Sequence, residues 1–287
     1  TDAAFATATH VVKQSMVVNR SSANSMEPRG TNADFNAETG HCTVYVGVQG
    51  VFGMQNTLAG AIFDDEIENF RVVTGHIGGS FGMKNFYAET IMTIWASRKL
   101  GRPVKWENDR EASLMADYHG RDKLAEMELA LDADGTFLAV RANIVANMGA
   151  YLSPLFVAHT LLSNGGIIGV YKTPAAHLTV TAIHTNTSST NPYRGSNRPD
   201  VAYYMERIID VAAAETGMDR MELRRRNMIP AGGFPHQAPL GVNYDCGNFV
   251  QDFEEALRII DADGFAARRT QSDANGKYRG LGLANNV

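Results

Sequence analysis

Twice in this chain a strand is followed by a polar loop that contains glycine and then by a helix, and this order restricts the fold most. In the first unit, the β-branched run Arg71–Thr74 leads to Gly78–Lys84, after which Tyr87, Ile91 and Trp95 recur at helical spacing. We call residues 78–84 the glycine loop. The pattern predicts that this loop joins the end of a strand to the start of a helix.

The second unit begins with the strand Leu178–His184 and ends in a helix whose first turn contains Pro199. Between them lie residues 191–198, which we call the arginine loop because it contains Arg194 and Arg198. Arginine side chains and the unpaired N–H groups of a helix start both favour anions. The local pattern leaves two interpretations open, an anion or cofactor loop and a capping loop with solvated arginines.

The glycine loop allows two interpretations as well. Glycines permit positive φ and close backbone approach, and the helix that follows would offer a positive dipole end to an oxyanion. However, Gly-Gly-Ser-Phe-Gly-Met-Lys at 78–84 matches neither a nucleotide P-loop nor a dinucleotide-binding turn, so a tight structural turn is the alternative. Gln49, at a predicted strand-to-helix junction, could orient an oxo or carbonyl group, although a loop-capping amide is the simpler interpretation.

The remaining patterns indicate an α+β fold with mixed sheets. Alternation in residues 123–131 and 137–145 around Asp132–Gly135 predicts a hairpin. Further strands are expected at 11–19, 30–35 and 41–48, helices at 218–227 and 249–267, and an extended segment at 278–284. The charged helix at 218–227 is expected to have a solvated or subunit-facing face. His119–Asp122 is expected to form an exposed, salt-bridged turn.

Composition narrows the classes of function. The 287 residues are 44% hydrophobic and 20% charged, as in globular proteins, and the net charge of −5 does not favour nucleic acid as a partner. Cys42 and Cys246 are too few for a disulfide scaffold, which favours a reducing, cytoplasmic location. Residues 142–171 carry no charge, but Pro154 and paired glycines interrupt them, so we expect buried core there and no membrane span. The N-terminus contains neither an initiator Met nor a signal peptide, as expected for an excised piece.

Several motifs, in one order across nearly the whole chain, resemble the molybdenum-binding subunit of the xanthine dehydrogenase and aldehyde oxidase family. Members with a separate large chain, as in carbon monoxide dehydrogenase, are the most similar. The motifs are Met26-Glu27-Pro28-Arg29, Gln49-Gly50, Gly78–Lys84, Leu100–Trp106, Gly149-Ala150-Tyr151, Tyr193-Arg194-Gly195 and Glu222–Asn227.

The resemblance implies a hydroxylase that oxidises an aldehyde or an N-heterocycle with oxygen from water. A molybdenum ion held by molybdopterin, expected in a dinucleotide form, would carry an oxo group, a sulfido group and a hydroxide or water. Electrons would leave through an iron–sulfur subunit to a FAD subunit. The cofactor carries the redox chemistry in such enzymes, whereas the protein supplies orientation and electrostatics.

The resemblance also assigns roles to residues. Gln49 would hydrogen-bond the apical oxo ligand, and Phe81 and Gly82 would lie beside the metal. No side chain is expected to bind the metal directly. The residues expected to bind the cofactor are Gln49, Gly79, Ser80, Phe81, Gly82 and Arg194, and those expected to line the substrate pocket are Phe81, Asn85 and His177.

Departures from the family pattern narrow the expected substrate. The xanthine-specific branch has a Glu and an Arg where this chain has Asn85 and His177, which disfavours purines. Copper-containing carbon monoxide dehydrogenases have a Cys, whose thiolate can hold copper, where this chain has Gly195. We therefore expect neither purine oxidation nor carbon monoxide oxidation by that mechanism.

The resemblance places the family's general base, a Glu in a Gly-x-Gly-Glu segment, downstream of Val287. No catalytic base is therefore assigned, and Glu89, Glu107 and Glu206 are interpreted as structural. We expect residues 1–287 to be the first half of a molybdenum cofactor-binding domain, which could divide into sub-lobes at about 1–150 and 151–287 and would need its C-terminal half for activity. The alternatives are a scaffold of the same fold that binds no metal and a generic anion-binding α/β domain.

Overall fold

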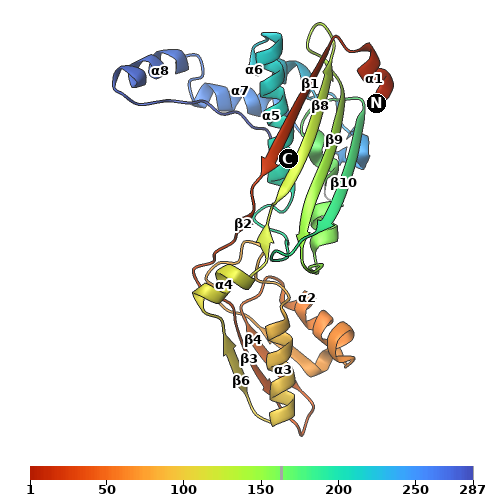
Figure 1. The fold of residues 1–287 in the computed structure, drawn as a ribbon, viewed down its shortest axis with the longest axis vertical. Helices are drawn as coiled ribbons and strands as arrows, with labels where there is room; N and C mark the ends of the chain where they lie inside the picture. The colour runs from red at the N-terminus through yellow and green to blue at the C-terminus, as the bar shows by residue number, and fades with distance from the viewer. Residues whose placement is uncertain (162–163, 287) are drawn as a thin grey trace.

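The computed structural model describes residues 1–161 and 164–286 and contains two four-stranded sheets, each with its own hydrophobic core. Figure 1 shows the two sheets one above the other along the long axis of the molecule. The fold is α+β with mixed sheets, as the sequence predicts.

The first sheet has the strand order β1-β8-β9-β10. Strands β1, β8 and β9 are antiparallel neighbours, whereas β10 runs parallel to β9. The predicted hairpin is confirmed as β8 and β9. The bounds are β1 His10–Val18, β8 Lys123–Leu131, β9 Phe137–Gly149 and β10 Ala176–His184.

Helix α5 (Arg198–Thr216) covers this sheet and packs against β1 and β8. Pro199 lies in its first turn, and Gly217, with φ of 72°, ends it in the left-handed conformation that glycine adopts without strain. Tyr204, Ile208 and Ala212, which share one helical face, are fully buried in the core. Burial of this apolar stripe fixes the helix start, and with it the arginine loop, relative to the sheet.

The second sheet has the order β5-β4-β3-β6, with β4 and β5 parallel and the other pairs antiparallel. Helix α3 (Ala88–Leu100) packs against β3 and β6. The strand bounds are β3 Gly30–Phe35, β4 Cys42–Val46, β5 Phe70–Val73 and β6 Val104–Glu107. Cys42 is a buried strand residue, as predicted, and burial raises the pKa of its thiol to about 11.

Shorter elements complete the fold. Strand β2 (Ser21–Ser22) pairs with β7 (His119–Gly120) between the two sheets. Helices α7 and α8 extend from the first sheet as the blue arm in Figure 1. The other elements are α1 Asp2–Thr7, α2 Val51–Asn56, η1 Thr57–Phe63, η2 Ile67–Asn69, α4 Arg110–Ala116, η3 Val157–Leu161, η4 Gly165–Ile168, α6 Arg220–Asn227, β11 His236–Gln237, η5 Pro239–Gly241, β12 Asn243–Tyr244, α7 Phe249–Ile259 and α8 Phe265–Ala274.

Each sheet contains one parallel pair, and both pairs matter for the site. The carboxyl ends of parallel neighbours lie at the same edge of a sheet, and ligand sites form at such edges. Gln49 follows β4 and the glycine loop follows β5, so the β4–β5 pairing brings them together. In the first sheet, the arginine loop follows β10, whose arrow points toward the second sheet in Figure 1.

Three predictions need correction. The helix expected at 249–267 is two helices, because Asp261 adopts φ of 49° and its side chain accepts from the Gly264 N–H. Arg224 in the charged helix is not solvated but fully buried, where Glu206 and Asp210 neutralise its charge. Residues 278–284 form no strand.

Among the described residues, no helix is both long enough and apolar enough to cross a membrane.

Candidate functional site

The glycine loop adopts backbone conformations that favour glycine. Gly78, Gly79 and Gly82 have φ of 52°, 95° and 94°, and Phe81 has φ of 56°. Helix α3 begins at Ala88, so residues 85–87 separate the glycine loop from the helix start. The loop thus joins the end of β5 to the start of α3, as predicted, and contacts with other segments hold it.

Two of these glycines are required by close neighbours. A Cβ atom on Gly78 would lie 2.3 Å from the Glu27 Cβ, and one on Gly82 would lie 2.5 Å from the Pro192 carbonyl oxygen. Real Cβ contacts are not this short, so a side chain at either position would displace its neighbour. The glycine loop is thus packed between the Glu27 segment and the arginine loop.

Gln49 is bound to the glycine loop at three points. The side-chain Oε1 accepts from the Gly82 backbone N–H at 2.7 Å and from the Ser80 hydroxyl, and the Gln49 backbone N–H donates to the Lys84 carbonyl at 3.0 Å. The Lys84 N–H in turn donates to Ser80 Oγ at 2.9 Å. The structure therefore brings together four of the residues that the sequence assigns to cofactor binding, Gln49, Gly79, Ser80 and Gly82.

The buried Lys84 side chain stabilises the glycine loop. Its side chain is 1% exposed, and its ammonium donates to Glu27 Oε2 at 2.9 Å and to the Ile77 carbonyl at 2.5 Å. Ion pairing with Glu27 offsets the cost of burying this charge. The role of Lys84 is structural, because its charge points toward the loop backbone.

The arginine loop contacts the glycine loop directly. The Arg194 N–H donates to the Phe81 carbonyl at 2.8 Å, and the Arg194 guanidinium lies 5.8 Å from the centre of the Phe81 ring. Phe81 is 43% exposed. In the described part of the chain, the Arg194 guanidinium has no hydrogen-bond or ion-pair partner, so it is available to an external anion.

A buried charge cluster holds the arginine loop in place. Asp200, in the first turn of α5, pairs with Arg121 at 2.8 Å and with Lys123 at 2.7 Å, and all three side chains are at most 12% exposed. Arg121 also donates to the carbonyls of Arg194 and Ser196. Burial lowers the pKa of Lys123, and the neighbouring Asp200 carboxylate opposes that shift. The cluster therefore ties the middle of the arginine loop and the start of α5 to the start of β8.

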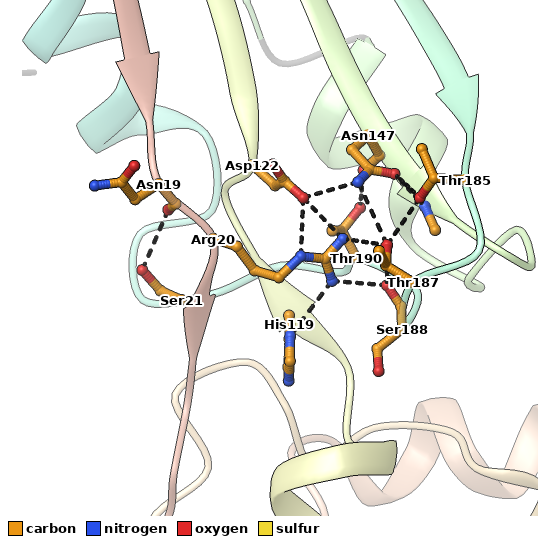
Figure 2. A network of polar contacts seen from close by, with 11 residues as sticks. Asn19, Arg20, Ser21, His119, Asp122, Asn147, Thr185, Thr187, Ser188 and Thr190 are labelled. Carbon is orange, nitrogen blue, oxygen red and sulfur yellow. Dashed lines mark hydrogen bonds and ion pairs between the residues drawn. The ribbon is translucent and has the colours of Figure 1, made fainter.

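A second network, drawn in Figure 2, holds the chain that leads into the arginine loop. Arg20 donates to Asp122 Oδ2 at 2.8 Å, to Thr187 Oγ1 at 2.7 Å and to the Ser188 carbonyl at 2.7 Å. It also lies 3.3 Å from His119 Nδ1. Burial lowers the pKa of His119, so the neutral ring accepts from Arg20.

This arrangement corrects the prediction for His119–Asp122. The segment is salt-bridged, but it is half-buried or buried, and His119–Gly120 forms β7. A Cβ on Gly120 would lie 2.2 Å from the Tyr193 Cβ, so this glycine permits the arginine loop to pack here. No local pattern indicates these roles, because the partners are distant in sequence.

A cavity of about 360 Å³ lies at the start of α5, and another of about 610 Å³ lies beside Gln49. The larger cavity is lined by Gln49 and Asn85 and mainly by apolar and aromatic residues, among them Tyr87 and Tyr118. The two tyrosine rings stack with centroids 4.5 Å apart. Asn85 donates its amide N–H to the Gly82 carbonyl, which leaves its Oδ1 as an acceptor.

Arg29, in the Met-Glu-Pro-Arg motif, supports this aromatic wall. Its guanidinium lies 3.5 Å from the centre of the Tyr87 ring and donates to Asp117 at 2.6 Å and to Glu89 at 3.2 Å. Burial raises the pKa of Asp117, and the Arg29 guanidinium opposes that shift. Glu89 is thus ion-paired, as Glu206 is with Arg224.

His177 lies apart from the other predicted site residues. It is exposed near the start of β10 and pairs in register with Arg141. His184, at the end of β10 that leads to the arginine loop, lies seven positions further along, a span of about 23 Å along a strand. The structure does not place His177 at the cavity beside Gln49.

Comparison with known proteins shows which family contains this chain. Residues 1–228 match the molybdopterin cofactor-binding domain. The chain belongs to that family. Members of the molybdopterin cofactor-binding family with similar sequences include subunit gamma of the 6-hydroxypseudooxynicotine dehydrogenase complex of Paenarthrobacter nicotinovorans, which is 33% identical over 98% of this chain and 36% of that protein. The carbon monoxide dehydrogenase large chain of Hydrogenophaga pseudoflava is 32% identical over 99% of this chain and 36% of that protein.

Solved structures agree with the fold of this family. Quinoline 2-oxidoreductase from Pseudomonas putida 86 matches with a TM-score of 0.89 and 30% identity over 96% of this chain and 35% of that one. The aldehyde oxidoreductase of Desulfovibrio gigas, at 22% identity, has a TM-score of 0.81 and shows the fold alone. The chain thus spans about a third of the length of these relatives.

Proposed function

We propose that this chain provides one wall of the active site of a molybdenum hydroxylase. The observation that carries the proposal is the set of free donors where the two loops meet. Gln49 has both oxygen lone pairs occupied, and its Nε2 has no hydrogen-bond partner in the described residues. The exposed Arg194 guanidinium is available beside Phe81. Both donors are exposed, so they can bind a ligand rich in acceptor atoms without first breaking a contact within the chain.

The chemistry of these donors fits a molybdopterin cofactor. The cofactor would present oxygen acceptors to Gln49 Nε2 and its phosphate to a cation such as Arg194. Phe81, at the contact between the two loops, would shape the approach to it. When bound, the molybdenum cofactor supplies two-electron oxidation with oxygen from water, and this chain's residues hold and orient it. We infer a dinucleotide form of the pterin, as in the resemblance drawn from the sequence.

The cavity of about 610 Å³ is our proposed substrate site. Its size suits a small organic molecule, and stacked Tyr87 and Tyr118 favour a flat ring. Asn85 Oδ1 would accept a hydrogen bond from a substrate N–H or O–H group. Related proteins are named for nicotine, 6-hydroxypseudooxynicotine and quinoline, which supports an N-heterocycle, with an aldehyde as the second substrate class.

Carbon monoxide is a less suitable substrate by the copper mechanism. Gly195 has φ of 85°, and a Cβ there would lie 2.9 Å from the Pro199 ring. A cysteine at this position would therefore be strained in this chain. The position does not favour a thiolate ligand for copper.

The rest of the assembly is part of the proposal. Relatives bear names such as subunit gamma, large subunit and large chain, which supports an enzyme of several subunits. We infer iron–sulfur and FAD subunits as electron acceptors, and the remainder of the molybdenum subunit as the source of the general base. The free thiols of Cys42 and Cys246 are consistent with a cytoplasmic location.

The test uses the complete molybdenum subunit that carries this chain, assembled with its partners. We expect dye reduction with quinoline, nicotine or an aldehyde, and none with residues 1–287 alone. Gln49→Ala and Arg194→Ala should each lower turnover, by about 10²-fold for Gln49, with subunit assembly intact. Arg207→Ala, which removes an exposed arginine from α5, should not change turnover.

Two results would contradict the proposal. Turnover by residues 1–287 alone would refute the requirement for the remaining subunit. Molybdenum-free complexes after cofactor reconstitution would favour the alternative, a scaffold of the same fold that binds no metal.

A further inference from the structure

The donor and acceptor roles of the Ser80 hydroxyl follow directly from its hydrogen-bond partners. A backbone N–H can only donate, so the Gln49 side-chain atom 2.7 Å from the Gly82 nitrogen must be the carbonyl oxygen Oε1. By the same rule, Ser80 Oγ accepts from the Lys84 N–H at 2.9 Å. The single Ser80 proton is therefore directed to Gln49 Oε1.

These contacts determine which way the Gln49 amide faces. Its Oε1 receives two donors, which occupy both of its lone pairs. Its Nε2, which has two protons, has no partner in the described residues, and Gln49 itself is exposed and lines the cavity. A flip of the amide would bring Nε2 against the Gly82 N–H, donor against donor.

We propose that Ser80 is a positioning residue that locks the Gln49 amide with its Nε2 protons toward the molybdenum cofactor. The effect on the cofactor rests on the proposed function, whereas the hydrogen bonds that fix the Gln49 amide lie within this chain. Ser80 is 5% exposed and is directed at Gln49, so it acts through that residue. Its hydroxyl carries a chain of hydrogen bonds from Lys84 N–H through Ser80 to Gln49.

A matched control lies beside the glycine loop. The Ser25 hydroxyl is also buried and has no hydrogen-bond partner within residues 1–161 and 164–286. The Ser25 Cβ is 3.5 Å from where a Cβ on Gly79 would lie. Ser25→Ala therefore removes a buried hydroxyl beside the glycine loop without breaking a hydrogen bond. Ser80→Ala removes one that makes two. Ser80→Thr keeps the hydroxyl and serves as the rescue variant.

The experiment measures two quantities in the complete subunit with its partners. Hydrogen–deuterium exchange of peptides covering residues 80–86 should be faster in Ser80→Ala, because the Lys84 N–H loses its acceptor and Gly82 loses a fixed partner. With an N-heterocycle as substrate, kcat should fall about three- to tenfold with little change in KM. Ser25→Ala should match the parent protein in both, and Ser80→Thr should restore both.

Unchanged exchange in Ser80→Ala would overturn the lock, as would an equal effect of Ser25→Ala. Exchange that changes in Ser80→Ala while kcat remains at the parent value would overturn the role in positioning Gln49. If the parent complex holds no molybdenum and shows no turnover, the proposed function fails, but the exchange comparison still decides whether Ser80 locks Gln49.

Discussion

The glycine loop and the arginine loop meet at Phe81 and Arg194, yet different forces hold them. The glycine loop is fixed mainly by close packing at positions where only glycine fits and by neutral hydrogen bonds to Gln49. Its one ion pair among the described residues is Lys84–Glu27. The arginine loop is fixed by charge, through Asp200 with Arg121 and Lys123 and through Arg20 at its stem.

This difference has a physical consequence. A change to the charge cluster leaves uncompensated buried charge and should reduce the stability of the first sheet and α5. A change to the glycine loop should mainly displace Gln49 and the contact between the loops, at a smaller cost in stability. The two loops can therefore be tested separately.

The largest effect is expected for Asp200→Asn. It leaves Lys123 and Arg121 as buried cations without their common carboxylate, so the free energy of unfolding should fall by about 3–5 kcal/mol. Urea denaturation measures this. The exposed Glu255–Arg258 pair provides the control, because Glu255→Gln should leave stability unchanged. Equal effects of the two variants would mean that charge does not hold the arginine loop.

Gly82→Ala should have the next largest effect, about 2–4 kcal/mol, because it combines positive φ with a clash against the Pro192 carbonyl. Gly40→Ala separates the two causes. Gly40 has φ of 74° but no neighbour within 4 Å of an added Cβ, so its cost should be about 1–2 kcal/mol. If both variants lose the same stability in urea, the packing of the loops contributes nothing.

The smallest effect concerns pH and His119. The pKa of folded His119 lies below its ordinary value of 6.5, so its neutral form stabilises the fold above pH 6.5. This contribution is lost as pH falls from 6.5 through the folded pKa, because the unfolded chain then binds the proton more readily. Urea midpoints between pH 7 and pH 5 should therefore fall less in His119→Asn than in the parent protein. Parallel curves would show that His119 does not couple protonation to the stem of the arginine loop.

Local chemistry made part of this structure predictable. The β8–β9 hairpin is encoded by alternation around an Asp-Gly turn, and the start of α5 by Pro199. The break between α7 and α8 is also local, but the helical periodicity on either side obscured the turn chemistry of Asp261–Gly264.

Contacts between distant residues could not be predicted in this way. Nothing near Arg20 indicates that it reaches Asp122, 102 residues away, or Ser188, 168 residues away. Buried Arg224 resembles its exposed neighbours in sequence and differs only in the partners that the fold provides. For the candidate site, motif order predicted Gln49, Ser80 and Gly82, whereas the amide orientation of Gln49 required their geometry.

The central claim is that the two loops together face a molybdopterin cofactor. Its most direct test is the molybdenum content of the complete subunit that carries this chain, purified with its partners and compared with the Gln49→Ala and Arg194→Ala variants. We expect stoichiometric molybdenum in the parent protein, retained in Gln49→Ala and reduced in Arg194→Ala, because only the arginine would neutralise cofactor phosphate. A parent subunit that stays free of molybdenum after cofactor reconstitution would contradict it.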